Sequence, residues 1–225
     1  MTRGTGRLAR ETSRRAQAEG DADAHDAAGR VRILDAAEQL FDERGLDGVS
    51  LRTVTTASGQ RNASAIQYHF GGREGLIEAV LVRRRDEVER ERNRLLDELE
   101  QAGPVTPGAA IRAAVEPLVT LLADPGGRRY LRLLFQASVH PSFTGYQATA
   151  FASSMTRVVV HAGPLIDRVP VDSQIPRLRL GVRLILLALA DKARTIDATG
   201  ATPSGPDLTA LSVELTRVVI AVIGA

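Results

Sequence analysis

The stretch NASAIQYHFGGREGL, Asn62–Leu76, places a tyrosine, a histidine and a phenylalanine in consecutive positions and then ends on two glycines. Phe, Trp and Tyr together make up only 4% of this chain of 225 residues. Asn62 is a good N-cap because its side chain can accept a hydrogen bond from a free backbone N–H. The glycine pair provides a C-terminal stop. We therefore predict a short helix that runs to Phe70, with Ile66 and Phe70 one turn apart and facing inward.

Two further helices are predicted before this stretch. Apolar side chains recur at three- and four-residue spacing from Val31 to Phe41, which is typical of an amphipathic helix, and Gly45 ends it. Ser50 is then a good N-cap for a short second helix that begins at Leu51. Two short helices joined by a glycine-containing turn form a helix-turn-helix.

The outward face of the third helix has the composition that DNA recognition needs. Small residues let a helix approach base edges, glutamine can pair with adenine through two hydrogen bonds, and tyrosine and histidine can donate to phosphate oxygens. Arg73 adds a charge at the free backbone amides of the next helix, which favours a phosphate contact. We expect the DNA contacts to come from Arg52, Thr53, Arg61, Asn62, Ser64, Ala65, Gln67, Tyr68, His69 and Arg73.

Three runs of residues resemble the N-terminal domain of the TetR family of bacterial transcriptional repressors. They are RILDAAEQLFDERG, VSLRTV and QYHFGGREGL, within about Arg30 to Leu81. The resemblance implies a repressor that binds a palindromic operator in double-stranded DNA as a homodimer and is released by a small-molecule effector. It also implies an all-α fold, in which a three-helix DNA-binding domain precedes a helical domain that binds the ligand and dimerises through its last two long helices.

Composition and periodicity suggest three segments. Residues 1–29 carry few large apolar side chains, which predicts a disordered basic arm whose plainest role is solubility. Residues 30–81 form the helix-turn-helix domain, and 82–225 form the regulatory and dimerisation domain. After a long helix from Arg73 to Gln101, we expect helices at about Pro107–Ala123, Gly127–Val139, Phe143–Ala162, Pro176–Ile196 and Asp207–Ile223. Proline removes a backbone donor, so Pro117 should kink or split the first of these.

Two groups of residues in the second segment are candidates for binding. Aromatic and polar side chains in the middle of the chain have the composition of a ligand site, although core burial explains each of them singly. They are Tyr130, Phe135, His140, Phe143, Tyr146, Phe151 and Met155. Apolar residues at helical spacing in the last two helices fit a seam between two subunits and ordinary core burial equally well. They are Leu180, Leu184, Leu187, Leu211, Leu215, Val218 and Val222.

Other classes of protein are disfavoured by what the sequence lacks. It has no cysteine and no catalytic or nucleotide-binding motif, so we expect neither an enzyme nor a cofactor nor a metal site. The longest apolar run, Leu184 to Ala190, is far shorter than the roughly 20 residues that cross a bilayer, and we expect a cytoplasmic protein with no membrane partner. Two alternatives remain open. One is an enzyme whose site is assembled from distant residues; the other is an adaptor that uses the charged segment Arg83–Arg94, for which a solvated helix is the plainer interpretation.

Overall fold

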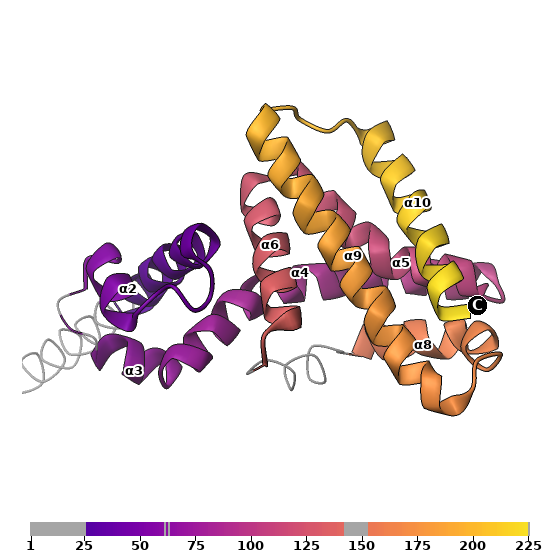
Figure 1. The fold of residues 1–225 in the computed structure, drawn as a ribbon, viewed down its shortest axis with the longest axis horizontal. Coiled ribbons are helices and arrows are strands. Elements are labelled where there is room, and N and C mark those ends of the chain that lie inside the picture. The colour runs from indigo at the N-terminus through magenta and orange to yellow at the C-terminus, as the bar shows by residue number, and fades with distance from the viewer. Residues whose placement is uncertain (1–25, 61, 63, 142–152, 225) are drawn as a thin grey trace, which may run out of the picture.

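The computed structural model describes residues 26–60, 62, 64–141 and 153–224. Within those ranges the regular secondary structure is helical and no strand is present, which confirms the predicted all-α fold. The molecule is elongated, with a small group of N-terminal helices at one end and a larger helical bundle at the other (Figure 1). None of the helices in these ranges is long and apolar enough to span a membrane.

The N-terminal group is the predicted helix-turn-helix with one helix before it. Its helices are residues 26–44, α2 (Leu51–Ala57) and α3 (Ser64–Phe70). The backbone N–H of Thr53 donates to Ser50 Oγ over 3.1 Å, and that of Ser64 donates to Asn62 Oδ1 over 3.0 Å, so both predicted caps are present. Gly45 has a φ of 76°, the left-handed conformation that ends a helix.

The first helix starts earlier than the composition indicated. Residues 26–29, which the sequence places in a disordered arm, are helical. Asp26 lies 3.3 Å from His69 Nε2 in α3, and Gly29 is buried. Contacts with a distant helix thus order a turn that has little apolar surface of its own, which a composition-based prediction cannot detect.

Helix α4 (Arg73–Ala102) connects the two ends of the molecule (Figure 1). Four apolar residues in its first turns, Leu76, Ile77, Val80 and Leu81, are buried in a core that also contains apolar residues of the three preceding helices. Val88 belongs to the same core. The long helix predicted from the sequence is confirmed, and one hydrophobic core extends through both ends of the molecule.

The bundle is built from α4 and five further helices. They are α5 (Pro107–Thr120), which continues into the 3-10 turn η1 (Leu121–Ala123), then α6 (Pro125–Val139), α8 (Ser153–Ile166), α9 (Val171–Thr199) and α10 (Gly205–Gly224). The part of the predicted helix Phe143–Ala162 that lies in residues 143–152 is outside the described residues.

Two helices differ near a proline from one of the sequence predictions. Helix α5 is not split at Pro117 but runs on to Thr120 and only then tightens into η1. Helix α9 begins at Val171, before Pro176, where the sequence prediction started it. A proline near a helix start removes a single backbone hydrogen bond, and packing against the bundle outweighs that loss.

A charged contact joins α6 to the first helix. The Arg132 guanidinium donates to both carboxylate oxygens of Asp42, over 2.7 and 2.6 Å, and also to Asp197 of α9 over 2.5 Å. The side chains of Arg132 and Asp42 are each only 13% exposed. The hydrogen bond with Asp42 raises the pKa of Arg132 and outweighs the effect of burial. The pair therefore fixes how the N-terminal helices sit on the bundle.

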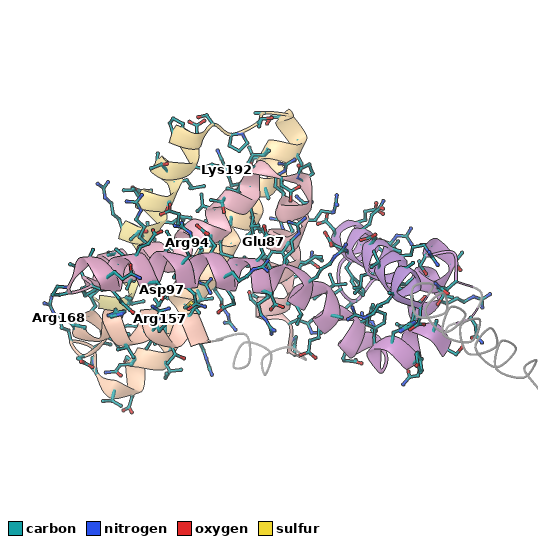
Figure 2. All side chains as sticks on the ribbon, turned by 180° about the vertical axis from the view of Figure 1, so that it is seen from behind. Glu87, Arg94, Asp97, Arg157, Arg168 and Lys192 are labelled. Carbon is teal, nitrogen blue, oxygen red and sulfur yellow. The ribbon has the colours of Figure 1, made fainter. Side chains whose placement is uncertain are left out.

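A second charged contact holds α8 against α4 (Figure 2). Arg157 of α8 donates to Asp97 over 2.7 Å and to Glu100 over 2.8 Å, both on α4. The hydrogen bond from Arg157 lowers the pKa of Glu100, so this clamp is present at neutral pH. Because the acidic partners are exposed, solvent screens it more than the contact between Arg132 and Asp42.

The contact between Arg132 and Asp42 should be worth more than an exposed ion pair. We expect Arg132→Met to lower the free energy of unfolding by about 2 kcal/mol or more, because it leaves the Asp42 carboxylate buried without its partner. The control is Arg112→Met, which removes an exposed pair with Glu116 at 3.2 Å and should change stability by less than about 0.5 kcal/mol. Urea unfolding at one protomer concentration measures both; equal losses would contradict the assignment.

Candidate nucleic-acid interface and internal cavity

Helix α3 separates a buried side from an exposed side. Ile66 is 0% exposed and belongs to the core, whereas Tyr68 is 81% exposed. Ser64 and Gln67 are also exposed, as is Asn62 just before the helix. The structure thus presents four of the predicted DNA-contact residues to solvent on one short helix and its cap.

Helix α2 adds two more of the predicted residues. Arg52 is exposed in its first turn. Thr53 is half-buried, and its hydroxyl lies 2.8 Å from Ser50 Oγ, so this side chain supports the start of the helix. Arg61 lies outside the described residues.

Two residues assigned to the outward face of α3 are largely covered. Ala65 packs against the hydrophobic core. The His69 side chain is only 10% exposed and lies near Asp26 of the first helix. The rings of His69 and Tyr68 form an edge-on pair, with 5.1 Å between their centroids. The sequence places both residues on the outward face, but residues 26–29 extend the first helix so that Asp26 lies 3.3 Å from His69 Nε2. A DNA contact from these two residues stays a prediction.

Arg73 holds the turn after the first helix. Its Nη2 donates to the backbone oxygen of Leu46, its Nε donates to that of Val49 over 3.4 Å, and Asp47 lies 3.7 Å away. The side chain remains 27% exposed. A phosphate contact from Arg73 also stays a prediction, and the side chain has a structural role beside it.

The same turn is linked to α6 of the bundle. The backbone N–H of Leu46 donates to Gln136 Oε1 over 3.2 Å, and His140 Nε2 lies 3.1 Å from Asp47 Oδ1. His140, predicted to bind a ligand, is therefore placed at the junction between the two ends of the molecule. Phe135, another residue of that group, is half-buried and packs against the core. Phe143, Tyr146 and Phe151 lie outside the described residues.

A partly open cavity of about 130 Å³ lies between α4, α5, α6, α8 and α9 of the bundle. Two of the predicted ligand residues, Tyr130 and Met155, line it. Most of its wall is aliphatic and includes Ala114, Leu118, Leu134, Val182, Ile185 and Leu186. An apolar pocket with a few polar groups is the usual form of a small-molecule site.

The charged part of the wall comes from α4. Arg85, Glu89 and Arg92 recur at helical spacing and all line the cavity. Arg92 is only 6% exposed, so the charged segment Arg83–Arg94 is not simply a solvated helix. The ligand site predicted from the sequence contains the aromatic residues and misses these three charged ones. The sequence feature that could have indicated them is Val88, an apolar residue on the same helix face within the charged segment.

The predicted dimer residues are divided between the core and the surface. Leu215 is buried. Three residues are half-buried, namely Leu184, Leu211 and Val222. Three are exposed apolar side chains, namely Leu180, Leu187 and Val218.

Comparison with solved structures shows a shared fold. A probable transcriptional regulatory protein, RHA5900, is 16% identical with a TM-score of 0.50, over 87% of this chain and 99% of that one. A tetR-family regulatory protein from Rhodococcus RHA1 is 16% identical over 88% and 97% of the two chains, with a TM-score of 0.49. A TetR-family member from Streptomyces coelicolor is 23% identical over 86% and 89%, with a TM-score of 0.48. Among curated proteins, none matches the chain significantly.

The sequence of the N-terminal helices matches a family model. Residues 33–80 match the family model of the bacterial regulatory proteins, tetR family. These residues run from the first helix through the helix-turn-helix into the first turns of α4. Residues 33–80 therefore form an N-terminal domain of the TetR type, the DNA-binding helix-turn-helix domain of bacterial regulatory proteins.

Proposed function

We propose that this protein is a repressor that binds a palindromic operator as a homodimer and leaves it when a small molecule fills the bundle cavity. The observation that carries the proposal is helix α3, which is fixed in the core through Ile66 and exposes Gln67 and Tyr68 on its other side. Those side chains can reach base edges and phosphates without any rearrangement of the domain.

Helix α9 supports the homodimer because it has apolar residues on two sides. Ile185 and Leu189 are buried in the bundle. Leu180, Leu184 and Leu187 recur at three- and four-residue spacing on the other side of the helix, and two of these three are exposed. A second copy of the chain that covers this face would bury them in a helix-pair interface. A dimer also doubles the DNA footprint, because one seven-residue recognition helix contacts few base pairs.

Helix α4 supports release by an effector. Its first turns pack in the core with the helix-turn-helix, and Arg85, Glu89 and Arg92 further along it line the cavity. An occupant that shifts α4 therefore shifts the position of α3, and in a dimer it changes the distance between the two recognition helices. Such coupling is reciprocal, so DNA weakens effector binding by the factor by which the effector weakens DNA binding.

Gln67 should contribute to base recognition. With operators selected from a random pool of DNA duplexes, Gln67→Ala should relax the preference at one base pair, at a cost of about 1–3 kcal/mol on the preferred sequence. The control is Gln101→Ala, an exposed glutamine near the far end of α4, which should leave the preference unchanged. An equal loss on every sequence would assign Gln67 to a backbone contact.

Arg73 should contribute one phosphate contact. Arg73→Ala should weaken binding to all duplexes and reduce the slope of log K against log salt by about one unit. Because Arg73 also holds the backbone oxygens of Leu46 and Val49, the alanine variant loosens that turn as well. The control is Arg73→Lys, which loses the guanidinium geometry but keeps the charge, and so should keep the slope. An unchanged slope in the alanine variant excludes Arg73 from this role.

Leu187 should lie in the dimer interface. Leu187→Glu should raise the dimer dissociation constant at least tenfold, on the order of 1.4 kcal/mol or more, because it buries a charge between the subunits. The control is Val160→Glu, which changes another exposed aliphatic residue, on α8. Sedimentation measures both. A wild-type chain that is monomeric at micromolar concentration and still binds its operator tightly would defeat the homodimer proposal.

A further inference from the structure

The cavity in the bundle contains a buried cation whose hydrogen bonds are incomplete. Arg92 of α4 is 6% exposed. Its Nη1 donates to Glu89 Oε1 over 2.6 Å and to Ser154 Oγ over 3.1 Å. Its Nε is also buried, and among the residues that the structure describes none accepts a hydrogen bond from it. A buried donor left without an acceptor costs free energy, so this atom points to a ligand that supplies one.

Both oxygens of the carboxylate beside Arg92 already accept a hydrogen bond. Glu89 accepts from Arg92 through Oε1, and its Oε2 accepts from the Ser154 hydroxyl over 2.7 Å. Burial lowers the pKa of Arg92, and the charge of Glu89 opposes that effect, but a guanidinium stays protonated at neutral pH. Glu89 is thus held in place as the partner of one nitrogen of Arg92 and accepts no hydrogen bond from Nε.

The charges on the cavity wall do not cancel. The wall carries two arginines, Arg85 and Arg92, against one carboxylate, Glu89, so its formal charge is 2 − 1 = +1. The other acid near Arg85 is Asp86, whose Oδ1 is 3.5 Å from Arg85 Nε and whose side chain is 67% exposed, so solvent screens it. A monoanion would neutralise the wall, a neutral ligand would leave the charge in place, and a cation would be repelled.

We propose that the cavity binds a small monocarboxylate with an apolar body. Its carboxylate accepts from the Arg92 guanidinium, and its body contacts the aliphatic wall around Leu134 and Ile185. The cavity of about 130 Å³ is close to the roughly 150 Å³ of an engineered apolar cavity that binds benzene, so the body is a single ring or a short chain. This inference rests on the proposed effector function and specifies the chemical class of the effector.

The test uses three acids and their neutral amides as probes: benzoate, phenylacetate and hexanoate, and benzamide, phenylacetamide and hexanamide. Isothermal titration of the full chain at pH 7.5, without DNA, measures each dissociation constant. At least one acid should bind at least tenfold more tightly than its amide, because only the acid adds a charge-assisted hydrogen bond at Arg92. Equal affinities of each acid and its amide, or no binding of any of the six, overturn the proposal.

Two variants test whether the acids bind in this cavity. The double variant Arg92→Met with Glu89→Gln removes both charges together, so that no carboxylate is left buried alone, and should reduce the preference for acids over amides, with only the charge of Arg85 remaining. Ala114→Leu fills the cavity from α5 and should weaken the binding of acids and amides alike. An undiminished preference for acids in the double variant contradicts the role of Arg92.

A milder variant keeps the test decisive if the double variant does not fold. Arg85→Gln changes a side chain that is 29% exposed, and it should weaken the binding of the acids while leaving that of the amides unchanged. Equal weakening of both contradicts the proposal.

Operator binding, measured separately, distinguishes this inference from the proposed function. If the acids bind at Arg92 but leave the operator affinity unchanged, the site stands and the release function fails. If acids and amides bind equally and both release the operator, the release function stands and the carboxylate proposal fails.

Discussion

A single helix that belongs to both ends of the molecule sets the geometry of this protein. Helix α4 buries its first apolar turns in the core with the helix-turn-helix, and further along it buries Val88 and Arg92 within the bundle. An α-helix is stiff over this length, because each turn is hydrogen-bonded to the next. Whatever displaces α4 in the bundle therefore displaces the end that carries the helix-turn-helix.

Helix α6 is a second connection between the N-terminal helices and the bundle, and its two faces make different contacts. Leu134, Ala137 and Ser138 line the cavity. Arg132 and Gln136 contact the N-terminal helices through Asp42 and the turn after the first helix. The cavity wall and the junction between the two ends are thus parts of one short helix. Because these contacts are hydrogen bonds, and the one with Asp42 is charged, a rotation of α6 would break interactions that a purely apolar interface would tolerate.

Burial distinguishes charged residues that the sequence alone does not tell apart. Arg83–Arg94 contains arginines and glutamates in close alternation, which on an exposed helix would form ion pairs of little consequence. Such a pair is present between Arg94 and Glu91, at 2.6 Å on the surface. Arg92 makes a similar contact with Glu89, but it does so inside the bundle, where water no longer shields the charge. Arg94 thus contributes little to stability, whereas Arg92, two positions earlier, is a candidate ligand contact.

The sequence by itself determined the helix-turn-helix, because the signals for it are local. The caps Ser50 and Asn62, the stop at Gly45 and the apolar spacing each act within a few residues, and they give the same helices in the folded chain. Only the tertiary structure decided the surroundings of the candidate sites. His69 is covered by Asp26, and Arg92 is held by Ser154, which is 62 positions away along the chain. Contacts at such separation leave no periodic pattern in the sequence, since they depend on how whole helices pack.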